Sequence, residues 1–221
     1  MSRKKLLLLL PAAVLLLIAA VLLLLQNSPS DRFIIPDHIT VCLDAGHGGS
    51  DPGAVFEGRQ EKDDNLAMVL AVRDALEAHG ADNLTVLLTR EEDTALELEE
   101  RVAFANEKDA TLFVSIHRNS GGGQGVETWV SADGHRPETE LATLIQANLK
   151  EADITKDRGV KKGTASNPHA SYYVVGHTRM PACLVELGFI DNQWDNMALD
   201  DNFDLWAQAI ADGILQMVKL K

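Results

Sequence analysis

Apolar side chains occur in two different arrangements along this chain of 221 residues. Residues 6–25 form one continuous apolar run, preceded by Arg3, Lys4 and Lys5. A run of about 20 apolar residues is long enough for a helix to cross a bilayer core, and the basic residues would stay in the cytoplasm. A cleaved signal has a shorter apolar region and a small-residue exit site. The ending LLLLQN lacks such a site, so residues 1–25 are predicted to be a membrane anchor in preference to a signal segment. Whether this segment is cleaved stays open.

After a tether, residues 26–38, short strand-like runs alternate with stretches of helical spacing. Gly80 suits the position just past a helix end, and Thr94 and Glu97 have the spacing of a capping box. Strand–helix alternation implies an α/β fold: a single open, mostly parallel, twisted sheet of about six strands with helices on both faces. Residues 39–221 then form one domain. The predicted strands are residues 39–43, 84–88, 111–117, 126–130, 172–175 and 182–185, and the predicted helices are residues 61–79, 94–106, 137–151 and 203–218.

Charge and cysteine content narrow the class of protein. The formal net charge is −13, and it becomes −16 when the three basic residues of the anchor are left out. So acidic a body argues against a nucleic-acid partner. Cys42 and Cys183 both lie inside apolar runs, where buried free thiols are common. Free thiols are therefore favoured, although two cysteines in an exported protein could also pair.

Two histidines and two glutamates lie at the ends of apolar runs or at a helix start: His47, Glu61, His117 and Glu186. Open α/β sheets place ligands beyond the carboxyl ends of their strands, so these side chains are expected on one rim. Two histidines and a carboxylate suit zinc and leave a position for water. A second carboxylate, Glu186, is partly desolvated beside a buried strand and can act as general base or acid. The residues therefore indicate a zinc hydrolase.

Each of these residues also has a plainer interpretation. His47 lies in a GHGG turn, which could instead cradle a phosphate, but no lysine follows as in a P-loop. The glycines are expected to let the backbone bend so that the His47 ring reaches the rim. His117 could be a satisfied, half-buried strand residue. Glu61 could only stabilise a helix dipole, and Glu186 could be a surface residue.

Several further side chains are candidates for supporting roles. Asp44 could orient a ligand histidine or only form a turn. Arg90 is expected to brace the rim, and Asn119 to face the substrate. The remaining histidines fall into two groups: residues 38, 79 and 135 are expected in solvent, whereas residues 169 and 177 flank the predicted strand 172–175 and could line a groove.

Eight short segments, in order, carry a resemblance to a known family: LDAGHGGSDPGA, EKDDN, LTREED, ERVAFAN, LFVSIHRNS, GVETWV, DRGVK and MPACLVELGFIDN. Together they resemble the N-acetylmuramoyl-L-alanine amidases of the zinc-dependent amidase-3 type, from about residue 39 to residue 219. The resemblance implies that His47, Glu61 and His117 hold one zinc ion and that Glu186 is the catalytic carboxylate. The bond cut would join the lactyl group of N-acetylmuramic acid to L-alanine in peptidoglycan.

The chain departs from the family pattern at two positions and in the length of the segment between Val130 and Arg158. Arg118 stands where a small or apolar residue is usual, so it could narrow the groove or pair with a substrate carboxylate. Asp195 stands where a glutamate is usual and is expected to cap a helix. Only about 27 residues separate Val130 from Arg158, too few for the long inhibitory helix of regulated members. An open site is therefore predicted.

The resemblance places the protein outside the cytoplasm, either anchored to a bacterial membrane or secreted, with peptidoglycan as its partner. An activator protein stays unknown. A bare catalytic domain behind one membrane segment resembles members that act in spore-cortex maturation. Two alternatives remain open: a zinc peptidase or deacetylase on peptidoglycan, and a peptidoglycan-binding module without catalysis.

Overall fold

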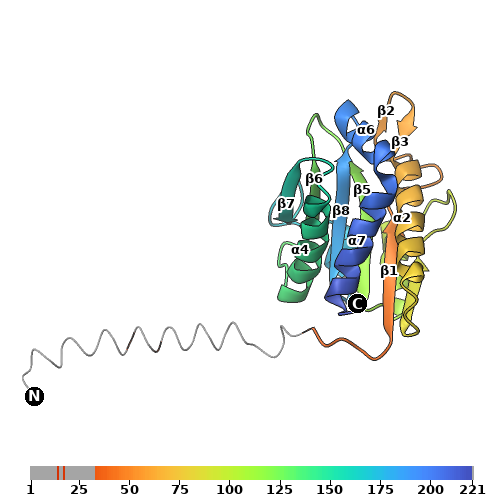
Figure 1. Cartoon of the computed structure of the whole chain (residues 1–221). Coiled ribbons are helices and arrows are strands. Elements are labelled where there is room, and N and C mark those ends of the chain that lie inside the picture. Colours follow the sequence, from red (N-terminus) through yellow and green to blue (C-terminus); the bar gives the residue numbers. More distant parts are fainter. Residues whose placement is uncertain (1–13, 15–16, 18–32, 221) are drawn as a thin grey trace, which may run out of the picture. The chain divides into compact units, whose positions relative to one another are not determined.

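The computed structural model describes Val14, Leu17 and residues 33–220 (Figure 1). Within this part of the chain, no helix is both long and apolar enough to span a bilayer. The predicted membrane segment, residues 1–25, lies outside the described residues except for Val14 and Leu17. Of the predicted tether, only residues 33–38 are described, and they form neither helix nor strand.

The core of the fold is a six-stranded sheet with the order β4-β1-β5-β8-β6-β7. Strand β6 runs antiparallel to β8, and all other neighbours are parallel. The prediction of an open, mostly parallel α/β sheet is therefore confirmed. The strands are β1 (Ile39–Ala45), β4 (Leu84–Leu88), β5 (Leu112–Asn119), β6 (Val126–Val130), β7 (Asp157–Lys162) and β8 (Ala182–Phe189), and a separate hairpin pairs β2 (Val55–Phe56) with β3 (Arg59–Gln60).

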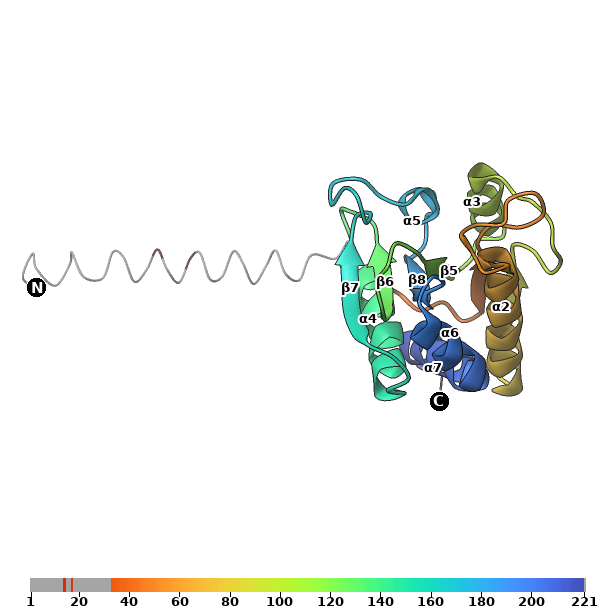
Figure 2. The same cartoon turned by 90° about the horizontal axis from the view of Figure 1, so that it is seen from above.

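Helices cover both faces of the sheet, but unequally (Figure 2). Long helices pack on one face: α2 (Glu61–Ala78), α4 (Arg136–Glu151) and α7 (Phe203–Met217), with the shorter α6 (Gln193–Asp201) beside them. The other face carries only α3 (Leu98–Glu107) and the single-turn α5 (Tyr173–His177). The thinly covered face leaves room for a cavity near the carboxyl ends of the strands.

Side-chain alternation assigns the strand residues to these two faces. Ala182 and Leu184 of β8 belong to an apolar cluster under α3 and α5, together with Cys42, Phe113 and Trp129. Glu186 continues the same face of β8 two residues further on. Cys42 and Cys183 are both buried and free, as predicted.

Several elements differ from the predictions, including α6 and the β2–β3 hairpin, which were not predicted. Residues 172–175 form the start of α5 and not a strand, because a short apolar run has no period that separates a strand from one helical turn. Val174 and Val175 still bury their side chains in the cluster under α3 and α5. Strand β7 was not predicted as an element of its own. It lies at the sheet edge and is rich in charged residues, which hides the strand pattern.

The helix ends agree with the predictions except at α3. Its capping box is formed by Glu97 and Glu100, so the prediction that Thr94 caps this helix was wrong. The chain at residues 95–97 is extended or irregular, and the helix begins later than expected. Gly80 follows α2 with φ +72°, which is the left-handed conformation expected after a helix end.

A buried ion pair ties α3 to the end of β1. Arg101 Nη1 donates to Asp44 Oδ1 over 2.8 Å, and both residues are buried. Burial by itself would raise the pKa of Asp44, but the Arg101 charge and hydrogen bonds from Ser115 and Thr89 lower it below its ordinary value of 3.8. The pair therefore stabilises the fold above that pH, and this contribution is lost as the pH falls through the folded-state pKa.

We expect Asp44→Asn to lower the free energy of unfolding by about 3–5 kcal/mol at pH 7, because Arg101 would keep its buried charge without an anion. The difference from wild type should shrink as the pH falls below 3.8. Urea unfolding across this pH range measures both effects. Asp74→Asn is the matched control: it removes an exposed carboxylate paired with Arg73, and should cost at most about 1 kcal/mol. Equal losses in the two variants would contradict the structural role of the buried pair.

Candidate active site

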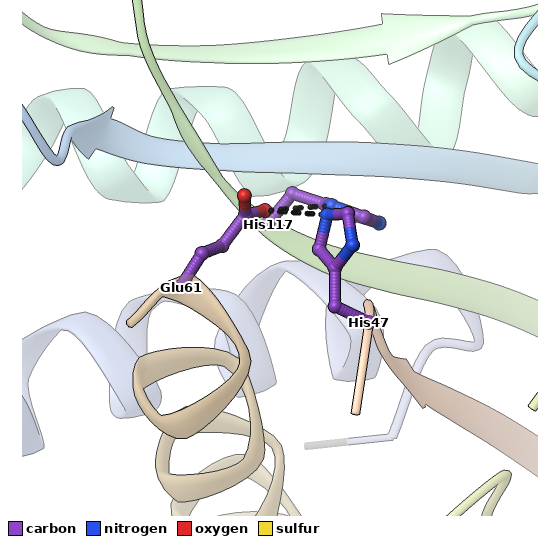
Figure 3. Close-up of side chains that lie close together, drawn as sticks. All are labelled: His47, Glu61 and His117. Atoms are coloured by element: carbon purple, nitrogen blue, oxygen red, sulfur yellow. Dashed lines mark hydrogen bonds and ion pairs between the residues drawn. The ribbon is translucent and has the colours of Figure 1, made fainter. Parts of the chain in front are cut away.

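Three elements bring His47, Glu61 and His117 together at the carboxyl edge of the sheet (Figure 3). His47 follows β1, Glu61 is the first residue of α2, and His117 lies in β5. His117 Nδ1 lies 2.9 Å from Glu61 Oε1, and His47 Nε2 lies 3.3 Å from the same oxygen. One ligand atom from each residue lies within 4.8 Å of the other two. The group can therefore hold a metal ion.

The glycine-rich turn after β1 presents His47 in the way the sequence predicted. His47 has φ +61°, a left-handed conformation that is unusual for a residue other than glycine. A Cβ on Gly46 would lie 2.1 Å from Cε1 of His117, and a Cβ on Gly48 would lie 2.3 Å from the Thr94 carbonyl oxygen. Glycine is needed at both positions because the backbone passes so close to its neighbours.

Two buried arginines hold the carbonyl groups of this turn. Arg90 donates from Nε to Ala45 O (2.9 Å) and from Nη2 to Gly46 O (3.0 Å). Arg101 donates from Nη2 to His47 O over 2.8 Å. The predicted bracing role of Arg90 is confirmed, and Arg101 shares it.

The carboxylate of Glu61 is buried and fully hydrogen-bonded. Oε1 accepts from the Arg118 backbone N–H (3.1 Å), and Oε2 accepts from the Ala54 backbone N–H (2.9 Å). Burial opposes ionisation, but the hydrogen bonds and charges of His117 and His47 hold the pKa of Glu61 far below its ordinary value. An ionised carboxylate between two imidazoles is a suitable ligand set for a divalent cation.

Asp51 orients the imidazole of His47 by a hydrogen bond. On sequence grounds, Asp44 was a candidate for this role. Asp51 Oδ2 lies 2.7 Å from His47 Nδ1, so Nε2 of the ring is directed at Glu61. Burial alone would lower the pKa of His47, yet hydrogen bonds with Glu61 and Asp51 raise it to about 9. Asp44 instead accepts hydrogen bonds from Arg101, Ser115 and Thr89. Asp44 therefore neither orients a histidine nor forms a turn, the two alternatives that the sequence left open, because it lies inside β1.

Glu186 is inside strand β8 and not after its end, because β8 continues to Phe189. Its position pairs with His117 of β5 and with Glu127 of β6. The side chain is 8% exposed, and its Oε2 has no hydrogen-bond partner among the described residues. Burial, reinforced by the charges of Glu61 and Glu127, raises the pKa of Glu186 to about 7. A carboxyl group with this pKa can exchange protons near neutral pH.

A cavity of about 590 Å³ opens beside these four residues and is lined by all of them. One wall consists of residues 95–98, which lead into α3, and the opposite wall of residues 172–174, at the start of α5. Helix α4, the one helix between Val130 and Arg158, packs against β6 and α7 on the other face of the sheet and does not line the cavity. The predicted open site agrees with this arrangement.

Two departures from the family pattern have roles that differ from those expected. Arg118 is buried, and its guanidinium donates to Asp64 and to Asn196 Oδ1, so it neither narrows the groove nor faces a substrate. Asp195 does not cap α6, because Asn192 does so. Asp195 Oδ2 instead accepts from the backbone N–H groups of Phe189 and Gly125.

The other histidines stay away from the cavity. His38 and His135 are exposed, as predicted, whereas His79 is half-buried. His169 and His177 do not line the cavity, so the suggestion that they form a groove was wrong.

Asn119 does line the cavity, as expected, together with several residues for which no role was predicted, among them Asp51, Leu96, Tyr172 and Tyr173. The spacing of Asp51, four residues after His47, was the one sequence signal that could have identified a member of this set.

Comparison with known proteins agrees with this geometry. A family profile described as N-acetylmuramoyl-L-alanine amidase matches residues 41–216. The sporulation-specific N-acetylmuramoyl-L-alanine amidase of Bacillus subtilis is 36% identical over 185 residues, which are 83% of this chain and 69% of that protein.

Two solved structures have the same fold. The catalytic domain of CwlV, an N-acetylmuramoyl-L-alanine amidase from Bacillus (Paenibacillus) polymyxa var. colistinus, has a TM-score of 0.74 and 36% identity, and the match covers 83% of this chain and 99% of that one. The CwlD amidase of Clostridioides difficile, solved in complex with the GerS lipoprotein, has a TM-score of 0.73 and 32% identity, with coverage of 83% and 100%. The chain therefore belongs to the N-acetylmuramoyl-L-alanine amidase family, and it is a peptidoglycan hydrolase that cleaves the amide between N-acetylmuramic acid and L-alanine.

Proposed function

We propose that the amidase works with one zinc ion held by His47, Glu61 and His117, and that Glu186 is its catalytic carboxylate. The observation that carries the proposal is the convergence of three ligand atoms, from the turn after β1, from α2 and from β5, within 4.8 Å beside an open cavity. Two imidazoles and one carboxylate fit the ligand set of catalytic zinc, which keeps a further position for water. Zinc dependence is also typical of the family.

When bound, zinc lowers the pKa of water and polarises the carbonyl of the scissile amide. The protein supplies the proton transfers. Glu186 Oε2 is buried and unpaired, so it can take a proton from the attacking water and later deliver it to the amine of L-alanine. Asp51 keeps His47 in the tautomer whose Nε2 is directed at Glu61, and Arg90 and Arg101 keep the turn around His47 rigid.

The enzyme would act at the cell envelope, with a lipoprotein as a partner. Residues 1–25 would anchor it in the membrane or direct its export, residues 26–38 would be the tether, and residues 39–221 would act outside the cytoplasm on the cell wall. A role in sporulation is supported by the sporulation-specific relative. The complex of CwlD with the GerS lipoprotein supports the idea that a lipoprotein is a partner of this enzyme.

Digestion of purified peptidoglycan tests the bond specificity. We expect new N-terminal L-alanine on intact stem peptides, measured by mass spectrometry of the released muropeptides. Cleaved stem peptides or deacetylated sugars would instead support the zinc peptidase or the deacetylase. Binding to peptidoglycan without any product would support the non-catalytic module.

Replacing a proposed ligand tests the metal site. His117→Ala should weaken zinc binding by more than about 100-fold, because losing a mere partner of a ligand already costs 10–100-fold. Competition with a chromogenic chelator measures the affinity. His169→Ala is the control, since His169 is exposed and lies outside the cavity lining. Zinc affinity that is equal in both variants would remove His117 from the ligand set.

Replacing the proposed base separates metal binding from chemistry. Glu186→Gln should keep one zinc per chain and lose about 10²–10⁴-fold in kcat, the usual contribution of a general base. Turnover of a soluble muropeptide and zinc content are measured on the same sample. Glu140→Gln, at an exposed position of α4, should behave like wild type. Full activity of Glu186→Gln would show that Glu186 is not the proton acceptor.

A further inference from the structure

A row of charged side chains crosses the sheet beside the site. His117 of β5 pairs with Glu186 of β8, and Glu186 pairs with Glu127 of β6. Paired positions on neighbouring strands place their side chains on the same face. Arg158 of β7 completes the row through a register shift: Val126 pairs with Asp157 while Thr128 pairs with Val160. Two residues of β7, Arg158 and Gly159, thus lie opposite Glu127, as in a β-bulge.

Three side-chain donors reach the two carboxylate oxygens of Glu127. Oε1 accepts from Asn119 Nδ2 (2.7 Å) and from Trp129 Nε1 (3.2 Å). Oε2 accepts from Arg158 Nε over 2.7 Å. The residue is 2% exposed. Both oxygens of this buried glutamate are therefore held by side chains of the protein.

The position of Arg158 is fixed by a second contact. Its guanidinium carbon lies 4.9 Å from the centre of the Phe189 ring, and Phe189 lies three residues after Glu186 in β8. A guanidinium over an aromatic ring is held by a cation–π interaction. Arg158 lies two strands away from Glu186, a backbone separation of about 10 Å. An arginine side chain is long enough to cover this distance and reach the Glu186 carboxyl group.

Glu186, in the same row, differs from Glu127 in the hydrogen bonding of its carboxyl group. It is buried next to Glu127, yet its Oε2 accepts no hydrogen bond from the described residues. The side-chain donors of Asn119, Trp129 and Arg158 all point to Glu127. A carboxylate that formed an ion pair with Arg158 would be a weaker proton acceptor.

We propose that Glu127 is a positioning residue for the hydrolysis: it binds Arg158, Asn119 and Trp129, and so keeps the Glu186 carboxyl group free of internal partners. This inference rests on the proposed catalytic role of Glu186. It assigns Glu127 no contact with the substrate or with the metal ion. The same carboxylate also holds Asn119, which lines the cavity, so it orders the edge of the site as well.

Four variants of the full chain, loaded with zinc in detergent micelles, test the proposal: Glu127→Gln, Arg158→Gln, the double variant, and Lys161→Gln as a control on the same strand. A soluble muropeptide gives kcat and KM, and zinc content and thermal midpoint are recorded for each. Glu127→Gln should lower kcat about tenfold, part of the contribution of a general base, with KM within about twofold, because the freed Arg158 moves to Glu186.

The double variant tests whether the loss of kcat comes from the released Arg158. Removing Arg158 as well should restore kcat to within about threefold of wild type, since no released cation remains to pair with Glu186. Arg158→Gln and Lys161→Gln alone should stay near wild type. Rates are compared at a temperature where every variant is folded, because an unpaired buried charge also destabilises. If Glu127→Gln does not fold, Glu127→Asp replaces it, with a smaller loss that Arg158→Gln should again reverse.

Two results would overturn the proposal: a wild-type kcat for Glu127→Gln, or a double variant as slow as the single one with equal zinc content. The second result would mean that the loss does not come from Arg158. Glu186→Gln in the same assay separates this proposal from the one it rests on. If Glu186→Gln keeps full activity, the proposed function fails, whereas an inactive Glu186→Gln beside a fully active Glu127→Gln overturns only the role of Glu127.

Discussion

The carboxylate of Glu61 is the interaction on which the site depends. It accepts hydrogen bonds from two backbone N–H groups and lies within hydrogen-bond or ion-pair distance of both imidazoles. Two of these groups come from the chain that follows β1 and two from the end of β5, so this one side chain, at the start of α2, joins three segments. The charge can stay buried because every oxygen has a partner. The three residues line the cavity, where a substrate can approach.

The sheet supplies the frame that makes this convergence possible. Parallel strands end on one edge, and the short helices α3 and α5 leave that edge accessible on one face (Figure 2). Ion pairs with at least one buried member accumulate there: Asp44 with Arg101, Asp64 with Arg118, and Glu127 with Arg158. Such pairs are weak sources of stability. Their common effect is to hold backbone and side chains around the site in one arrangement while Glu186 stays unpaired.

The sequence predictions succeeded where local pattern and burial agree. Strands β1, β4, β5, β6 and β8 are short apolar runs, and helices α2, α4 and α7 have a regular apolar period, so each was found. Residues 172–175 were assigned wrongly because four apolar residues fit a strand and a helical turn equally well. Strand β7 was missed since its residues are mostly charged. It is a strand because β6 offers it a free edge, a fact that no local pattern contains.

The sequence alone determined the residue types and order that identify the family, and with them His47, Glu61, His117 and Glu186. The type of each side chain is given directly by the sequence, and the ends of apolar strands can be predicted from it. Only the tertiary structure decided which partners surround them. The inward direction of Arg118 and the contacts of Glu127 depend on register between strands that are distant in sequence, whereas the contact of Asp51 with His47 depends on how the turn after β1 folds. Register follows from packing and bulges in three dimensions, so it becomes visible only when the sheet is assembled.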